Sequence, residues 1–149
     1  MGAEPFLIVS TVKTIIGQRL VRRLVSSKEK YFLSDAEIKN LERLIDLDRM
    51  LDFLKVERVI DQNATWKQVP FYRPIKSEES EDGYLGRLGI HEVLKVSPTV
   101  RETIMQGKTS RDIEEVACKE GMTTMIEDGI FKAVQGLTTI EEVLRVISE

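Results

Sequence analysis

Apolar residues in two stretches of the chain alternate with charged ones instead of following helical spacing. Ile15–Val25 is dense in β-branched and apolar side chains, and arginines are interleaved with them. Because successive strand residues point to opposite faces, this pattern predicts a strand with one charged face. Arg87–Val96 alternates in the same way and predicts a second strand. A short strand over Val69–Ile75 contains two prolines, which restrict it to a sheet edge.

After the first predicted strand, the spacing changes to that of amphipathic helices. Ser34 and Glu37 have the spacing of a capping box, in which the serine hydroxyl and the glutamate carboxylate each accept from a free backbone N–H. Two runs of apolar residues then recur on one helical face, which predicts two helices. We expect both stripes to be core, and a groove for a partner is the functional alternative. The stripes are Ile38, Leu41, Leu44 and Ile45, then Met50, Leu51, Phe53 and Leu54.

Regular helix caps divide the chain after Val96 into four predicted helices. Ser97 is placed as an N-cap before Pro98, and Ser110 opens the second helix. The third helix begins at Thr123 or Thr124, and Thr138 with Glu141 predicts a capping box for the last helix. The first three helices are expected to end at Gly107, Gly121 and Gly136. In the last helix, the apolar stripe of Ile140, Val143, Leu144 and Ile147 is expected to be buried.

Length and composition predict a folded α/β (α+β) chain. With 149 residues and 42% apolar content, it can form one compact domain or two small ones. A net charge of −3 lacks the signature of a polyanion-binding domain, so nucleic acid is not an expected partner. No apolar run reaches the roughly 18 to 20 residues of a membrane span, so no membrane insertion is expected. The single Cys118 fits a reducing cytoplasm, most simply as a small buried residue.

The residues with candidate chemistry form no strong catalytic motif. Glu78, Glu79, Glu81 and Asp82 are either ligands for a divalent cation or a solvated loop, and we expect the loop because the spacing fits no EF-hand. His91 is the only histidine, which argues against a histidine metal pair or a Ser-His-Asp triad. No Gly-x-x-x-x-Gly-Lys-Ser/Thr phosphate loop occurs anywhere.

Three segments of the chain resemble one protein family. Met1–Leu24, with its QRLVRRL motif, Gly83–Ser97, which begins GYLGR, and Gly121–Val146 are similar, in this order, to the C-terminal part of type II secretion and type IV pilus assembly ATPases. The resemblance implies that residues 1–25 plus 83–96 are the end of a RecA-like motor core and supply its small sheet. Residues 26–82 would be a helical insertion with an acidic loop, and residues 97–149 a C-terminal helical subdomain.

The same resemblance implies that ATP and magnesium are cofactors of the full-length parent only. The family's nucleotide-binding loop and magnesium-site acid lie upstream of the matching segments, so we expect no cofactor and no catalytic residue in this chain. In the motor, Gln18, Arg19, Arg22 and Arg87 would lie near a nucleotide or a neighbouring subunit. The alternative is that the arginines pair with acids such as Glu92 across adjacent strands.

Many family members bind a structural zinc through two Cys-x-x-Cys pairs, and this chain departs from that pattern. Val25 and Ser26 stand near the first pair, and Ser77 and Ser80 fall near the second with the same internal spacing. Because serine hydroxyls are poor zinc ligands compared with thiolates, we expect no metal. The helices over 34–56 are expected to take over the bracing role.

The function expected from the resemblance is that of a non-catalytic, C-terminal region of a hexameric assembly ATPase. Its expected partners are neighbouring motor subunits or the inner-membrane platform protein, which places it in the cytoplasm at the inner membrane. An exposed sheet edge would also favour a dimer of this chain. The alternatives are a free-standing helical adaptor and a DNA-binding helix pair. Residues 110–120 and 138–149 are too acidic for the latter.

Overall fold

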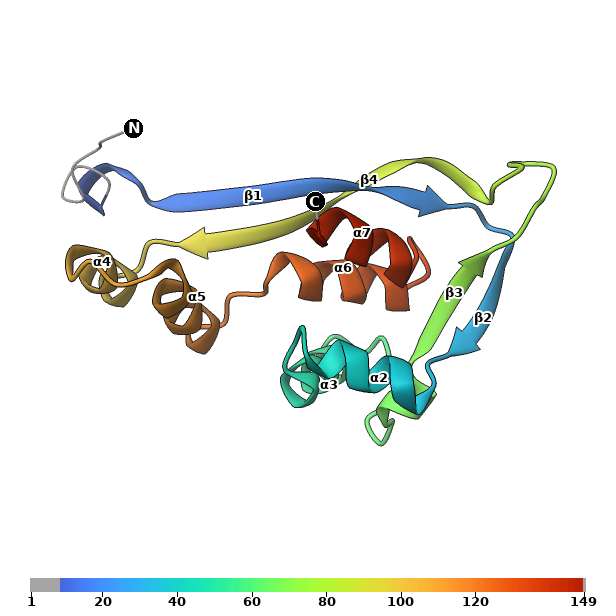
Figure 1. The fold of residues 1–149 in the computed structure, drawn as a ribbon, viewed down its shortest axis with the longest axis horizontal. Coiled ribbons are helices and arrows are strands. Elements are labelled where there is room, and N and C mark those ends of the chain that lie inside the picture. The colour runs from blue at the N-terminus through green and yellow to red at the C-terminus, as the bar shows by residue number, and fades with distance from the viewer. Residues whose placement is uncertain (1–8, 149) are drawn as a thin grey trace. The chain divides into compact units, whose positions relative to one another are not determined.

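The computed structural model describes residues 9–148 and contains both helices and strands, which confirms the mixed α/β class (Figure 1). The chain divides into two compact units. The first contains the described residues up to Gln18 together with His91–Met125, and the second contains Arg19–Ile90 and the residues from Ile126 onward. The domain boundaries expected at residues 25, 83 and 97 stay a prediction for the parent motor.

Both long predicted strands are present. β1 spans Thr14–Leu24 and β4 spans Tyr84–Lys95, and the two pair with each other in opposite directions (Figure 1). On β1 the fold buries Val21 and Leu24, while the interleaved arginines stay exposed. The pattern therefore predicted the strand, but the arginines do not share one face, because consecutive Arg22 and Arg23 point to opposite sides.

A second pair of strands lies within the second unit, and the sequence indicated only one of them. β3 spans Pro70–Pro74 and pairs antiparallel with β2, Lys28–Phe32, with Tyr31 opposite Phe71. The sequence analysis missed β2, because its KEKYF sequence carries three charges and little apolar signal. Tyr31 and Phe71 contact each other with ring centroids 6.2 Å apart, so a cross-strand aromatic pair stabilises these two short strands.

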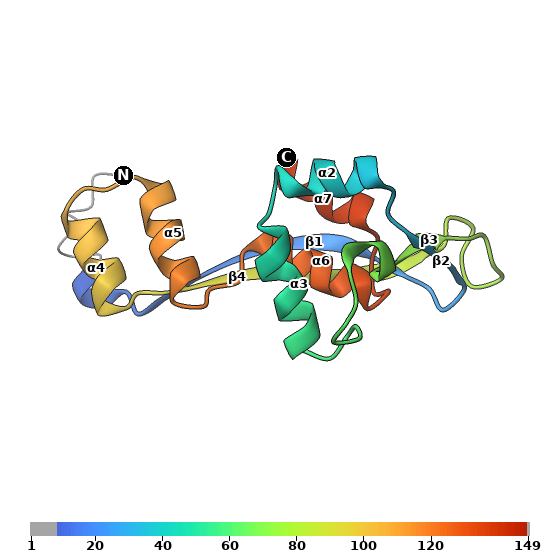
Figure 2. The ribbon, with the colours of Figure 1, turned by 90° about the horizontal axis from the view of Figure 1, so that it is seen from below.

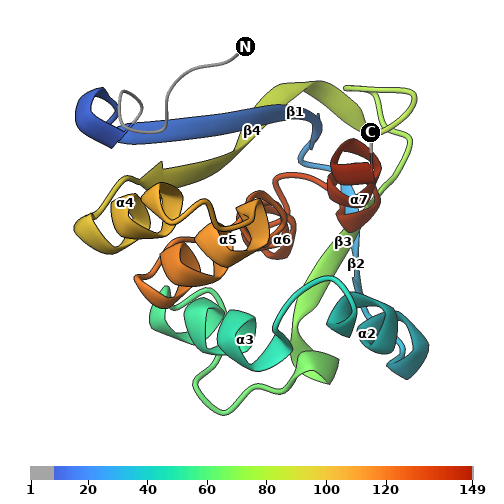
Figure 3. The same ribbon diagram turned by 60° about the vertical axis from the view of Figure 1, so that its left-hand side comes forward.

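The two helices expected after β2 form with the predicted cap. α2 spans Asp35–Glu42 with Ser34 as its N-cap, and both hydrogen bonds of the Ser34–Glu37 capping box are made. α3 spans Leu47–Val56, where the Asp46 carboxylate accepts from the Arg49 backbone N–H at 3.0 Å. The polypeptide then passes through a short 3-10 helix, η1, at Trp66–Gln68 before it enters β3. Figure 3 shows α2 and α3 near the end of the β2–β3 pair that points away from β1 and β4.

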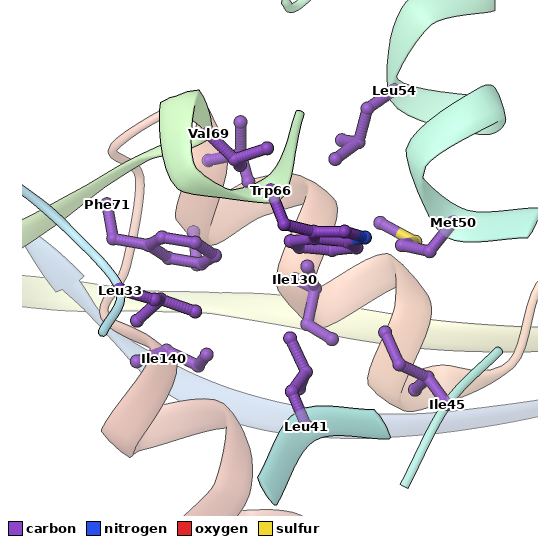
Figure 4. Packing of buried hydrophobic residues seen from close by; sticks show 12 residues of the cluster. Leu33, Leu41, Ile45, Met50, Leu54, Trp66, Val69, Phe71, Ile130 and Ile140 are labelled. Carbon is purple, nitrogen blue, oxygen red and sulfur yellow. The ribbon is translucent and has the colours of Figure 1, made fainter. Parts of the chain in front are cut away.

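One hydrophobic cluster joins the β2–β3 pair, α2, α3 and the last two helices of the second unit. Trp66 lies in this cluster next to Met50, and its indole N–H donates to the Leu47 carbonyl at 3.1 Å (Figure 4). The predicted stripes of α2 and α3 supply much of the core, although Leu44 is 54% exposed. The buried members are Leu33, Leu41, Ile45, Met50, Leu54, Trp66, Val69, Phe71, Ile130, Ala133, Val134 and Ile140.

The last two helices approach each other closely. α6 spans Met125–Val134, directly after Thr124, and α7 spans Ile140–Ser148. Gly129 of α6 packs against Val143 of α7 so tightly that an added Cβ would lie 2.4 Å from the nearer Val143 methyl carbon. The buried stripe of α7 is Ile140, Val143 and Val146, whereas the expected Leu144 and Ile147 are only half-buried.

The predicted cap of α7 is wrong by one residue. The Thr139 hydroxyl, not that of Thr138, accepts from the helix, and its donor is the Glu142 backbone N–H at 3.2 Å. The Thr138 hydroxyl instead donates to the Arg22 carbonyl on β1 at 2.8 Å. Both threonines are buried. A sequence with two adjacent threonines cannot show which one turns toward the helix, because that depends on the contact with β1.

The first unit contains the other two C-terminal helices. α4 spans Pro98–Met105 with Ser97 as N-cap, and α5 spans Ser110–Lys119 with a Thr109–Asp112 capping box. They lie side by side (Figure 2) around buried Val96, Val100 and Ala117. Cys118 was expected to be buried but is only half-buried, and its neighbour Ala117 is the buried residue. At the glycines that end α4, α5 and α6, φ is positive as expected.

Replacing Gly129 by alanine should destabilise the second unit by about 1 to 3 kcal/mol, because the new methyl overlaps Val143 in a packed core. The change is measurable as a lower free energy of unfolding in chemical denaturation. The double variant Gly129→Ala, Val143→Ala should show a favourable coupling of about 1 kcal/mol or more, since the second change removes the overlap. Additive losses in the two single variants would show that the helices do not meet at these residues.

Candidate subunit-contact site

The site predicted around the β1 arginines is built on one buried carboxylate. Glu142, in the first turn of α7, has a side chain that is only 3% exposed. Arg22 of β1 donates to it twice, from the guanidinium at 2.8 Å and from the backbone N–H at 3.0 Å. Arg145, one turn later on α7, donates to both carboxylate oxygens, at 3.1 and 3.3 Å. Two cations therefore face one anion.

These contacts determine the charge of Glu142. Burial alone would raise its pKa, but the hydrogen bonds from Arg22 and Arg145 and from the Arg22 backbone N–H lower the pKa to about 2. The carboxylate is thus ionised at neutral pH although water hardly reaches it. Because removing one partner of a buried ion pair leaves an uncompensated charge, Glu142 and Arg22 depend on each other for stability.

Residues of β4 and of the loop before it also contact Arg22. The guanidinium carbon of Arg22 lies 4.1 Å from the ring centroid of Tyr84, a cation–π geometry. Asp82 forms a further, exposed ion pair with Arg22 at 3.3 Å. The Tyr84 hydroxyl also lies 3.2 Å from the hydroxyl of Thr139, the cap of α7. The same arginine is therefore in contact with β4, with the acidic loop and with the last helix.

The four residues predicted to contact a nucleotide or a subunit lie in different surroundings. Gln18 and Arg87 are exposed on β1 and β4. Arg19 donates from its guanidinium to the Val146 backbone carbonyl on α7, and Arg22 occupies the Glu142 pocket. Arginine–acid pairing was the expected alternative, but the acid is Glu142 on the last helix. Glu92, the acid expected from the adjacent strand, accepts from the Met125 backbone N–H at 3.2 Å.

Ser77 and Ser80, which stand near a cysteine pair of the zinc-binding relatives, form a small turn. Each donates its backbone N–H to the carbonyl of the other, at 2.9 and 3.3 Å. The Ser80 hydroxyl lies within hydrogen-bond distance of the Asp82 carboxylate and the Tyr84 carbonyl. The hydrogen bond from Ser80 to the Asp82 carboxylate lowers the pKa of Asp82. Ser26 on the opposite segment donates to Glu79 at 2.8 Å. Hydrogen bonds thus join the two segments that lie near these positions.

Neither a cluster of metal ligands nor a membrane-spanning helix occurs in the part of the chain that the structure describes. Between residues 9 and 148, histidine, cysteine and carboxylate side chains form no group of three or more suited to a metal ion. Over the same residues, no helix combines the length and apolar character of a membrane span. What the described site does chemically is to hold charge: it anchors an arginine on a strand through a buried acid.

Several residues of this site could not be chosen from the sequence. Glu142 reads as an ordinary solvent-facing acid of a helix first turn, and its burial follows only from the packing of α7 against β1. Glu127 on α6 is a similar case, because it is buried and pairs with Arg49 of α3 at 2.8 Å. The one usable signal was the density of arginines on β1, since a guanidinium is well suited to a buried or interface ion pair.

The relatives of the chain show its family. A family profile described as "Type II/IV secretion system protein" matches residues 1–145. The chain is 38% identical over its whole length to a type II secretion system protein E of Xanthomonas campestris, and covers 24% of that relative. It is 34% identical to the type IV pilus assembly ATPases PilB of Thermus thermophilus and Pseudomonas aeruginosa, over 97% and 100% of the chain and 14% and 23% of those proteins.

The chain therefore belongs to the type II/IV secretion system protein family. It spans about a quarter or less of the length of these relatives. The resemblance stated from the sequence motifs is confirmed.

The Glu142 pair should make the second unit acid-sensitive. Because the folded-state pKa of about 2 lies below the ordinary value of 4.5, this group's stabilisation is present above about pH 5 and is lost as pH falls toward 2. The free energy of unfolding of Glu142→Gln should be lower at pH 7 by roughly 2 to 3 kcal/mol and should depend less on pH in that window. Glu141→Gln, at the exposed neighbour, is the control and should keep the parent pH profile. Equal profiles for the parent and Glu142→Gln would contradict the buried pair.

Proposed function

We propose that the chain is the non-catalytic C-terminal region of a hexameric secretion or pilus assembly ATPase, containing the end of its RecA-like core. In this role it makes contacts with neighbouring motor subunits or with the inner-membrane platform at the cytoplasmic side. The names of the relatives, a type II secretion protein E and type IV pilus assembly ATPases, support this assignment. ATP and magnesium would then be bound elsewhere in the parent motor.

The observation that carries the proposal is the apolar surface left open on the two long strands. In the second unit, Leu20 of β1 is 49% exposed and Leu85 of β4 is 66% exposed. In the first unit, Ile16 of β1 and Val93 of β4 are exposed to a similar extent. Large apolar side chains exposed on sheet strands are typical of a surface that another protein segment covers. A motor core or a neighbouring subunit would cover these strands.

The arginines support a division of roles within this surface. Arg19 and Arg22 contact α7 through the Val146 carbonyl and Glu142, so we propose that they hold β1 against the last helix while the exposed part of Arg22 faces outward. Gln18 and Arg87 are exposed and are the better candidates for direct contact with a nucleotide or a neighbouring subunit in the motor. A guanidinium suits either a phosphate or a carboxylate.

The contact role is testable in a full-length motor that contains this sequence. Leu20→Glu and Leu85→Glu should each reduce hexamer formation and ATP hydrolysis by about tenfold or more, because an unpaired charge would have to be buried in the contact. Val56→Glu, at an exposed valine on α3, is the control and should leave both unchanged. Analytical ultracentrifugation and phosphate release measure the two effects. Normal assembly of both strand variants, or ATP turnover by the 149-residue chain alone, would contradict the proposal.

The purified chain should also associate with itself through the open strand surface. Multi-angle light scattering is expected to show a dimer at high protein concentration and a monomer on dilution, because no motor core covers Leu20 and Leu85. Leu85→Glu should shift this equilibrium toward the monomer. Only monomer at all concentrations would contradict this prediction.

A further inference from the structure

A groove of about 210 Å³ is lined by residues of α2, of the turn after it and of α7 in the second unit. Its apolar lining comes from both helices and from the residue that precedes the cap of α2. Leu41 and Ile140 are buried, Leu144 is half-buried, and Leu44 stands at the edge with 54% of its surface exposed. Leu44 belongs to a stripe that the sequence predicts to be core, yet the fold leaves it open.

Acidic groups border this groove. Glu37 of α2 and Glu141 of α7 line it together with Asn40. Glu37 is fixed by its capping box, and the hydrogen bonds from Ser34 lower its pKa, so it is ionised at neutral pH. Glu141 is exposed and accepts from the Tyr31 hydroxyl at 3.4 Å.

One cation lies nearby, but it is already in contact with an aromatic ring. The Arg73 guanidinium carbon is 4.1 Å from the ring centroid of Tyr31. It lies close enough to Glu37 to lower the pKa of that carboxyl slightly, as the least of the contributing causes. The two charged residues that line the groove are thus both carboxylates, which makes its lining acidic.

We propose that this groove binds a short amphipathic helix of a protein partner. The helix would insert a leucine-sized side chain beside Leu44 and place lysine or arginine opposite Glu37 and Glu141. Apolar side chains line both walls: Leu41 of α2 and Leu44 in the turn just after it on one side, and Ile140 and Leu144 of α7 on the other, so that a third helix can pack between them. The acidic edge selects a basic helix and disfavours an anionic lipid or nucleic acid surface.

The inference deepens the proposed function, because it gives the chemistry of one partner that such a region would contact. It concerns a different surface from the open strands. Leu44 lies in the turn after α2 and Glu141 lies on α7, whereas the substitutions at Leu20 and Leu85 change β1 and β4. The two proposals can therefore fail separately.

The test uses the 149-residue chain and a synthetic helical peptide of roughly 15 residues, long enough to form an isolated helix. Leucines form its apolar stripe and lysines flank the stripe. Its control is the same peptide with glutamate in place of lysine. Methyl NMR shifts of Leu44 and Leu144 and fluorescence anisotropy report binding. We expect a dissociation constant on the order of 100 µM or tighter for the lysine peptide and about tenfold weaker binding of the glutamate peptide.

Substitutions in the chain place the binding at the groove. Leu44→Glu should weaken binding by about tenfold or more, since it puts a charge where the apolar side chain enters. Glu37→Gln with Glu141→Gln should weaken it by about threefold and reduce its salt dependence, while glutamine preserves the capping box. Val56→Glu, at an exposed apolar residue outside the groove, should change nothing.

Three results would overturn the inference. They are no binding of the lysine peptide at millimolar concentration, equal binding of both peptides, and equal losses in Leu44→Glu and Val56→Glu. A fourth is that Leu44→Glu, and not Leu85→Glu, abolishes self-association in light scattering, which would make a second copy of the chain the occupant. The first three results leave the strand-contact proposal standing, because that proposal depends on assembly and hydrolysis by the full-length motor. The fourth would also contradict the self-association expected through Leu20 and Leu85.

Discussion

The second unit depends on the neutralisation of one buried charge. Glu142 is almost inaccessible to water, and such a carboxylate is stable only when donors replace its hydration. Arg22 supplies two of these donors, one from its side chain and one from its backbone, so the strand itself and not merely a flexible side chain is fixed against α7. Tyr84, Thr138 and Thr139 then have defined places around the same arginine. The Glu142–Arg22 pair is thus the charged centre of the contact between the last helix and β1, to which Arg19 and Thr138 add further hydrogen bonds.

The helices were predictable because their signals are local. Ser34 with Glu37 and Ser97 with Pro98 satisfy the first backbone N–H groups within a few residues, so short sequence windows contain the necessary information. β2 was not predictable, because its stability comes from pairing with β3 about 40 residues later and from the Tyr31–Phe71 contact. The Thr138–Thr139 ambiguity has the same origin. Thr138 bonds to Arg22, more than 100 residues away in sequence.

The candidate site was predictable only in part. Alternation along β1 indicated which residues carry the positive charge, and the family resemblance directed attention to Gln18–Arg23. Neither source indicated the partner, because Glu142 and Glu92 are equally plausible acids until the packing of α7 is known. The groove between α2 and α7 is a further example. The helical stripe containing Leu44 predicted burial, and only the three-dimensional arrangement shows that this member of the stripe remains open.

The close approach of Gly129 to Val143 has a consequence for how this sequence can diverge. The space between α6 and α7 is shared, so a larger residue at position 129 must be matched by a smaller one at position 143. Among descendants of this chain, the two positions are therefore expected to covary. Covariation of two residues that take no part in any reaction would then reflect the distance between the two helices.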